Sequence, residues 1–410
     1  MINIDHEINF TNTSIITYIG SQNTNRDHYT GIMPDENELD VHLTNPPYGN
    51  SIVKTFNSGI QINHKSMLLP IYNNKFTFGL EYINDDVWDN ISSYNYTVDQ
   101  TTKNIGLFLQ SDLTFSERIS LLSGFRIDQH NMIDDIIINP RGSLLYKMKN
   151  SQIRISYGHG FRAPQAFDSD LHMAFAGGGV SRVNLSENLL PETSKSISIS
   201  INYDKSNQQS IFGFSLETFY TKLKNAFILE PLGEDEFGFI FEKRNGNNAV
   251  VQGLTFESRF NYNQKIQLQS GITLQSNRFS DAVTYIEDVE PINEFIKTPK
   301  NYAYSILTLY PYERITMNLN YMYTGKMKVP HISSANNRII QTDRFHEING
   351  KLNYIITQNS TNVQFEFYIG VKNILNAYQN DFDIGKNRDS NFIYGPAQPR
   401  TILIGIKAKH

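Results

Sequence analysis

The chain alternates apolar and polar residues in run after run, and the connections between the runs are by turns short and long. In one run, Ile197, Ile199 and Ile201 alternate with Ser198 and Ser200. Successive side chains of a β-strand point to opposite faces, so each run has one apolar face and one polar face. Runs of about ten residues with this alternation, separated by turn residues, are typical of a transmembrane barrel.

The alternation predicts about 17 strands, with ends uncertain by a few residues. Their expected ranges are 2–10, 13–25, 51–65, 73–85, 100–115, 118–129, 136–147, 151–161, 193–204, 209–229, 237–260, 265–278, 300–310, 314–328, 342–357, 362–377 and 396–409. The longer loops are expected at 26–50, 86–99, 130–135, 162–192, 230–236, 279–299, 329–341 and 378–395. A barrel with short periplasmic turns and long extracellular loops requires this alternation, whereas a soluble sandwich does not.

Composition agrees with an all-β transmembrane antiparallel β-barrel and argues against several other classes. The 410 residues include 23 Tyr and 26 Phe, contain no Cys, and carry a net charge of −5. The lack of cysteine excludes disulfides and thiolate sites, and the negative charge argues against a nucleic-acid partner. The sequence has no zinc-protease, nucleophile-elbow or Walker motif, so we expect no enzyme, metal site or cofactor.

Several segments, taken in order, resemble one known family. They are 157–164 (YGHGFRAP), 188–194 (NLLPETS), 249–257 (AVVQGLTFE), 370–376 (GVKNILN) and the closing stretch 395–406. Together they are similar to the C-terminal barrel part of a TonB-dependent outer-membrane receptor, over about residues 100–410. The box at 184–194 departs from the family pattern, because the proline expected after an asparagine is missing.

The resemblance implies a function and a location. Receptors of this family take up a scarce nutrient, namely a ferric siderophore, haem or cobalamin, across the outer membrane of Gram-negative bacteria. The barrel contacts outer-membrane lipid, and a plug domain couples transport to the TonB complex of the inner membrane. We find no plug, TonB box or signal peptide, and therefore expect residues 1–410 to form an incomplete barrel of about 17 out of 22 strands.

Two other functions remain open on the sequence alone. A passive outer-membrane porin would show the same strand pattern, but the family segments in family order argue against it. A non-functional truncated remnant of a receptor would explain why no plug or signal is found. The acidic clusters within 85–89, 134–135, 234–236 and 287–290 either bind a divalent cation through their carboxylates or, which is the more common meaning, keep the loops solvated.

Arg162 and His172 are candidate ligand-binding residues in the loop that follows the first family segment. Arg162 lies where a strand meets the loop, so it either faces the lumen and meets an anionic ligand or the plug, or pairs with Asp168 or Asp170. His172 is either an axial ligand for haem iron or an ordinary loop histidine.

Aromatic residues of an early loop are the remaining candidates. Trp88, Tyr94 and Tyr96 fall within the expected loop 86–99. Their rings either stack on a planar or hydrophobic ligand or belong to the upper aromatic girdle of the barrel.

Overall fold

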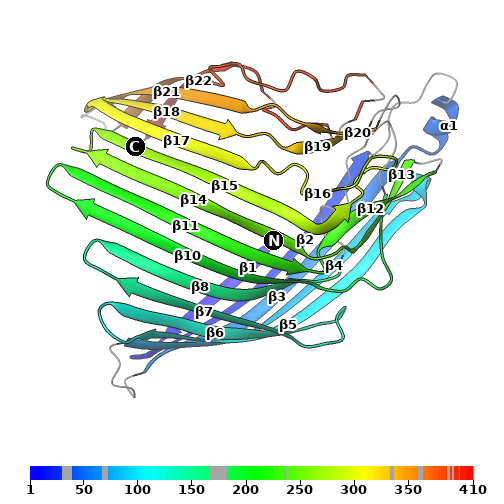
Figure 1. Ribbon diagram of the computed structural model, residues 1–410, viewed down its shortest axis with the longest axis horizontal. Helices are drawn as coiled ribbons and strands as arrows, with labels where there is room; N and C mark the ends of the chain where they lie inside the picture. The colour runs from blue at the N-terminus through cyan, green and yellow to red at the C-terminus, as the bar shows by residue number, and fades with distance from the viewer. Residues whose placement is uncertain are drawn as a thin grey trace.

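The chain folds into one large antiparallel sheet that curls round on itself, with its blue N-terminal strands behind the green strands from the middle of the chain (Figure 1). The computed structural model describes residues 1–29, 39–66, 73–165, 182–235, 238–332, 337–358, 363–385, 388–389, 392–396 and 398–409. The sheet has 18 strands, of which β16 (Ile292–Glu294) has only 3 residues. The other strands each have at least 8 residues and form the wall, in agreement with the expected number.

The wall strands follow one another along the chain. They are β1 (Ile2–Asn9), β2 (Thr13–Tyr29), β3 (Tyr48–Ser66), β4 (Asn73–Ile91), β5 (Tyr96–Thr114), β6 (Ile119–His130), β7 (Ile137–Lys147), β8 (Ser151–Arg162), β10 (Glu192–Ser206), β11 (Ser210–Lys224), β14 (Ala249–Tyr262), β15 (Ile266–Val283), β17 (Asn301–Tyr312), β18 (Ile315–Thr324), β21 (Phe345–Gln358), β22 (Val363–Lys372) and β23 (Thr401–Lys409).

Each wall strand pairs antiparallel with the next one in the chain, so successive connections leave from opposite ends. The long connections that follow Arg162 and Lys372 leave from the same end. The short turn that follows Ser206 lies at the other end. Successive connections therefore leave from opposite ends, as predicted, but their lengths do not alternate throughout, because only residues 92–95 join β4 to β5 at the end with the long connections.

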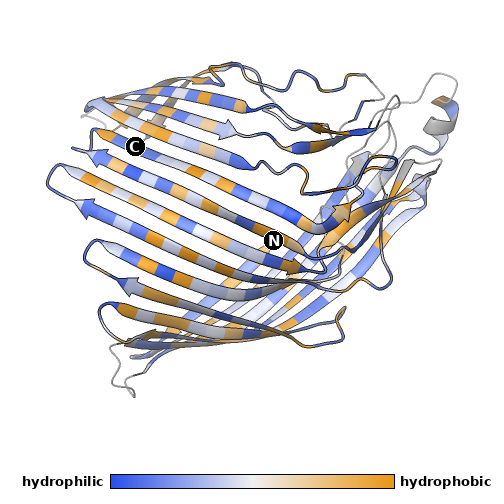
Figure 2. Ribbon diagram, viewed as in Figure 1, coloured by the Kyte–Doolittle hydropathy of each residue, from blue (hydrophilic) through white to orange (hydrophobic). Residues whose placement is uncertain are grey.

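The outward face of the sheet is apolar, and the hydropathy colours alternate along the strands as the sequence predicts (Figure 2). On β10, Ile197, Ile199 and Ile201 remain 44%, 39% and 37% exposed, whereas Ser198 and Ser200 on the inward face are half-buried. A soluble sandwich would bury these isoleucines in a central core. Their exposure indicates a surface made for contact with lipid.

The elements outside the wall gather at the end with the long connections (Figure 1). A small sheet contains β9 (Arg182–Leu185), β12 (Phe227–Asp235) and β13 (Gly238–Asn245), and a hairpin pairs β19 (Lys328–His331) with β20 (Arg338–Gln341). The short helices are α1 (Leu39–Thr44) and the 3-10 turn η2 (Ser92–Tyr94). No helix in the described part of the chain is long and apolar enough to cross a membrane.

The structure corrects three of the expected strands and one of the loops. The ranges 209–229, 237–260 and 314–328 each contain a break, at Asn225 (φ 55°), at 246–248 and at 325–327. The expected loop 86–99 is mostly strand, because β4 and β5 stay paired up to Ile91 and Tyr96. Strand ends that extend beyond the membrane meet water on both faces. They therefore lack the alternation of apolar and polar residues by which strands were predicted.

The sheet is curled but not closed. Among the described residues, β1 pairs with β2 alone and β23 pairs with β22 alone. The outward Ile402, Ile404 and Ile406 of β23 are 66%, 79% and 66% exposed. The fold is thus the incomplete antiparallel barrel that the sequence predicts.

Candidate ligand-binding lumen and mouth

The inward face of the wall, which we call the lumen, carries aromatic rings packed over glycines. Five inward rings lie directly opposite a glycine of the neighbouring strand, and a Cβ on any of these glycines would overlap the ring. The pairs are Tyr18–Gly59, Phe108–Gly79, Phe219–Gly253, Tyr304–Gly271 and Tyr368–Gly405. Rings that lie flat on the wall cover the backbone and leave the lumen wide.

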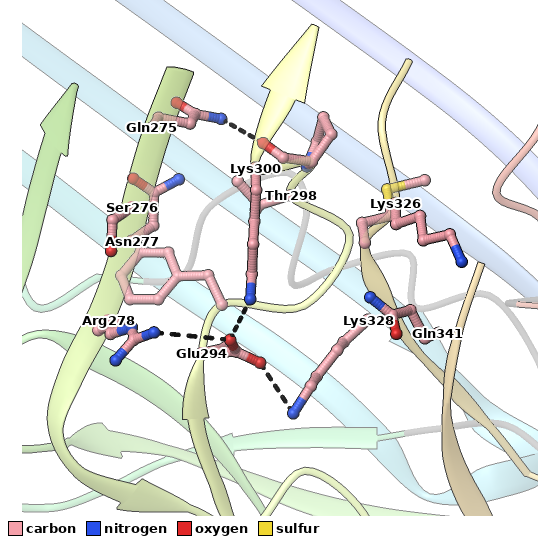
Figure 3. Close-up of a pocket in the computed structure, with 13 residues that line it drawn as sticks. Gln275, Ser276, Asn277, Arg278, Glu294, Thr298, Lys300, Lys326, Lys328 and Gln341 are labelled. Carbon is pink, nitrogen blue, oxygen red and sulfur yellow. Dashed lines mark hydrogen bonds and ion pairs between the residues drawn. The ribbon is translucent and has the colours of Figure 1, made fainter. Parts of the chain in front are cut away.

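A group of charged residues lies at the end with the long connections, between the end of β15, the short strand β16 and the start of β17 (Figure 3). We call Arg278, Glu294, Lys300 and Lys328 the rim cluster. The Glu294 carboxylate is 2.6 Å from Lys300 Nζ, 2.8 Å from Lys328 Nζ and 4.0 Å from an Arg278 guanidinium nitrogen. The hydrogen bonds from Lys300 and Lys328 lower the pKa of Glu294 to about 2.

The register shows which way the rim cluster faces. Arg278 is in phase with Ile272 and Leu274, which are exposed on the outward face of β15, and the pairing of β14 with β15 has no shift between them. Glu294 lies directly opposite Arg278. The rim cluster therefore lies outside the lumen and does not serve a ligand inside it.

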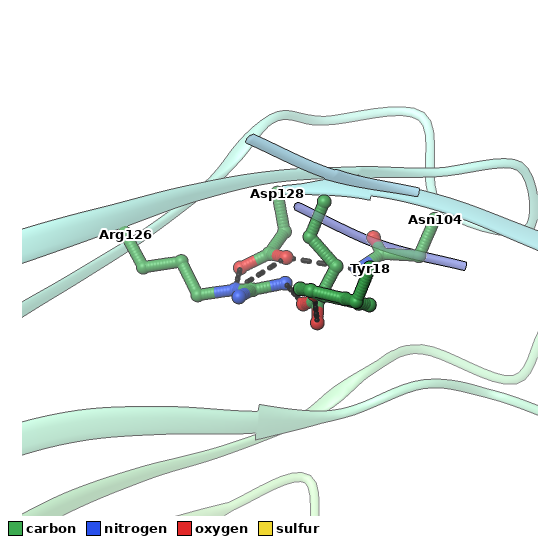
Figure 4. A network of polar contacts seen from close by, with 5 residues as sticks. Tyr18, Asn104, Arg126 and Asp128 are labelled. Carbon is green, nitrogen blue, oxygen red and sulfur yellow. Dashed lines mark hydrogen bonds and ion pairs between the residues drawn. The ribbon is translucent and has the colours of Figure 1, made fainter. Parts of the chain in front are cut away.

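A second polar group, the wall network, faces the lumen and joins four strands (Figure 4). Arg126 donates to Glu81 at 2.8 Å and to both carboxylate oxygens of Asp128, at 2.8 and 3.0 Å. Tyr18 donates to Glu81 at 2.7 Å, and Asn104 donates to Asp128 at 2.9 Å. Charged groups facing inward while the outward face is apolar match the polar lumen of a transmembrane barrel.

Arg162 belongs to a group at the lumen mouth that the sequence did not predict. We call Arg162, Glu192, Phe227 and Lys243 the mouth site. Arg162 Cζ lies 5.5 Å from the centre of the Phe227 ring, and Lys243 Nζ lies 5.2 Å from it. The Phe227 amide donates to Glu192 at 2.9 Å, which fixes the ring where the chain leaves the wall.

The two cations of the mouth site differ in exposure. Lys243 is only 3% exposed, and its Nζ donates to the Gln165 backbone carbonyl at 3.2 Å. Arg162 is exposed at the end of β8, opposite Glu192. Lys243 therefore positions Phe227 and the backbone at Gln165, whereas Arg162 is the exposed cation of the two.

A cavity of about 410 Å³ opens between the start of β5 and the small sheet. Tyr96, Asp99 and Gln100 line it from β5, and Val183 and Asn184 line it from β9. Tyr96 thus lines this cavity from the inward phase of β5, and its side chain is only 8% exposed. Its place beside the cavity is compatible with the proposed stacking on a ligand.

The other candidate residues fall elsewhere. Trp88 shares the outward phase of Leu80 on β4, so a ligand in the lumen does not reach its ring. Tyr94 lies in η2, where burial raises the pKa of its hydroxyl. His172, and the carboxylates Asp168 and Asp170 considered for Arg162, lie outside the described residues. Within the part of the chain that the structure describes, no group of three or more His, Cys, Asp or Glu could hold a metal ion.

Sequence reasoning missed Glu192, Phe227 and Lys243. Lys243 was assigned to a wall strand, and Phe227 to the end of another. Asn225, which has a left-handed φ of 55°, gives the only local sign of the break, because asparagine tolerates this conformation better than most residues. Even so, the contact between β12, β13 and β8 joins residues far apart in the sequence.

Comparison with known proteins places the fold in a family. The sequence matches the family described as TonB dependent receptor-like, beta-barrel, over residues 2–374. No curated protein matches it. Similar solved structures include the ferric enterobactin receptor of Pseudomonas aeruginosa, at 15% identity and a TM-score of 0.70. They also include the siderophore receptor PirA of Acinetobacter baumannii, at 12% identity and 0.71, and the ferric-catecholate import receptor Fiu of E. coli, at 15% and 0.68.

The alignments cover 99% of this chain and 60%, 61% and 62% of those three chains. The chain thus spans about three fifths of the length of the solved structures it matches. At these identities the likeness shows the fold, and the family match covers most of the sequence. The chain belongs to the TonB-dependent receptor-like β-barrel family.

Proposed function

We propose that this chain is the barrel part of an outer-membrane receptor that takes up an anionic ferric chelate, such as a ferric siderophore. The observation that carries the proposal is the mouth site. Arg162 is exposed at the end of a wall strand, and its neighbour Lys243 is buried against the same Phe227 ring. A guanidinium held over an aromatic ring offers both charge and a flat surface to a ligand of oxygen-rich aromatic groups.

The similar structures support this ligand class over haem and cobalamin. Those named above are receptors for ferric enterobactin, a siderophore and ferric catecholates. Uptake of haem would depend on an axial ligand such as His172. Uptake of cobalamin would not explain why the mouth site carries two cations beside a cavity.

Energy coupling belongs to the same proposal. The lumen requires a gate, and we propose that a plug domain outside residues 1–410 closes it and connects to the TonB complex. The apolar outward face would then lie in the outer membrane. The chain itself would carry out no bond chemistry, and selectivity would come from the shape and charge of the mouth.

The test is growth of a receptor-deficient host that produces the protein together with a plug, on ferric enterobactin, haemin or cyanocobalamin as the limiting nutrient. The proposal expects growth on the ferric chelate only, and loss of that growth when TonB is deleted. Growth that continues without TonB would indicate a passive porin. Growth on haemin or cyanocobalamin alone would contradict the ligand class.

A further inference from the structure

The outward position of the rim cluster raises the question of what its cations meet. The side chains of Arg278, Lys300 and Lys328 are 56%, 58% and 35% exposed, whereas Glu294 between them is 15% exposed. Lys326 lines the same pocket (Figure 3). Three cations, Arg278, Lys300 and Lys328, therefore approach one carboxylate, which leaves a surplus of positive charge on the outward side of the wall.

The cluster lies just beyond the apolar surface of its strand. Leu274, 48% exposed, ends the outward apolar series of β15, and Arg278 follows four residues later. At about 3.3 Å per residue, Arg278 lies roughly 13 Å beyond Leu274 along the tilted strand. That places the cations above the hydrocarbon region, at the depth of lipid headgroups.

Neighbouring strands repeat the arrangement. On β10, Lys195 precedes the outward Ile197 by two residues, and on β11, Lys222 follows the outward Tyr220 by two, so both lysines lie toward the end with the long connections. Lys195 and Lys222 lie directly opposite each other. Two like charges directly opposite each other destabilise a sheet, and an anion close to them would offset this repulsion.

We propose that the rim cluster binds the phosphate of an anionic lipid headgroup in the outer leaflet. Glu294 occupies the centre of the site as an internal anion. A phosphate approaching from the membrane side would bridge Arg278 and Lys328, because a guanidinium pairs with two phosphate oxygens at once. This inference rests on the outward face lying in the membrane and is independent of the nutrient that the receptor transports.

The test uses the full chain, delipidated in detergent, and native mass spectrometry with bis-phosphorylated lipid A as the probe. Phosphatidylcholine, which carries no net charge, is the control lipid. The double variant Arg278→Gln/Lys328→Gln should bind lipid A about tenfold more weakly or worse. Arg259→Gln, which removes an inward arginine that pairs with Asp204, should bind it as the wild type does. Equal binding by the double variant and the wild type would overturn the proposal.

Glu294→Gln separates lipid binding from a purely structural role of the cluster. If Glu294 competes with the phosphate, this variant should bind lipid A several-fold more tightly. Unchanged or weaker binding by a variant that keeps its thermal unfolding temperature would contradict the proposal. A third arm adds excess inorganic phosphate. Complete displacement of lipid A by phosphate would show a site for a soluble anion and would overturn the assignment to a lipid.

Discussion

Arg126 on β6 reaches Glu81 on β4 across the strand between them, with Nη2 2.8 Å from Glu81 Oε2. Gly106 of β5 lies beneath the guanidinium, and a Cβ at this position would overlap Arg126 Nη2. A pair that spans two strands is thus possible only because the middle strand has no side chain there.

Gly106→Ala should destabilise the barrel by about 1–3 kcal/mol, because Arg126 must move and the bond to Glu81 is lost. Unfolding in urea in lipid bilayers measures the change. The matched control is Gly158→Ala, also on the inward face, where the new Cβ would meet only Arg141 Cβ, at 3.9 Å. Equal effects of the two substitutions would contradict the role of Gly106.

The rim cluster should respond to acid in a defined range. The folded state lowers the pKa of Glu294 from 4.5 to about 2, so its stabilising effect is complete above pH 4.5 and is lost as the pH falls toward 2. Hydrogen exchange of residues 292–300 should accelerate over this interval. Glu294→Gln should remove the pH dependence, and an acceleration that persists in this variant would assign it to another group.

The single tryptophan reports on the outward face of β4. Trp88 lies beyond the outward Asn84 and Asp86, on the side of the strand away from Leu80, so water-soluble acrylamide should quench its fluorescence more than brominated lipid does. Leu80→Trp in a Trp88→Phe background should show the reverse, because Leu80 lies within the apolar band. Strong quenching of Trp88 by bromines at the bilayer centre would contradict this placement and show that the membrane covers Trp88 as well.

The two edges of the sheet should exchange amide hydrogens faster than their neighbours. In the described part of the chain, β1 and β23 each have one paired side, so alternate amides face away from the ladder. Mass spectrometry of peptides 2–9 and 401–409 should show about half of these amides exchanging faster than those of β2 and β22. Full protection of both edges would mean that they pair with each other or with another chain.

The wall could be predicted from sequence because lipid imposes the alternation. Ile197, Ile199 and Ile201 are apolar at every second position because this face of the strand contacts lipid. The turn after Ser206 is short because it only joins two adjacent antiparallel strands. The same reasoning placed Arg162 correctly at the end of a strand facing the lumen, since its phase is opposite to that of the outward residues of β8.

What lies above the membrane could not be predicted in this way. β12 and β13 leave the wall after Asn225 and pair with each other, and β13 also pairs with β9, from a distant part of the chain. No local pattern marks that pairing, so Phe227 and Lys243 could not be assigned to the mouth. The rim cluster was missed for a related reason, because Glu294 meets Arg278 only after the chain has turned back along β15.

The central claim is that the mouth site binds an anionic ferric chelate, and a binding titration of the purified protein tests it most directly. Ferric enterobactin should bind the wild type, and Arg162→Gln should weaken binding about tenfold, the loss of roughly 1.4 kcal/mol. Arg259→Gln, a lumen arginine at the end with the short turns, should leave binding unchanged. Binding of haemin or cyanocobalamin in preference to ferric enterobactin, or equal affinity of Arg162→Gln and the wild type, would contradict the account.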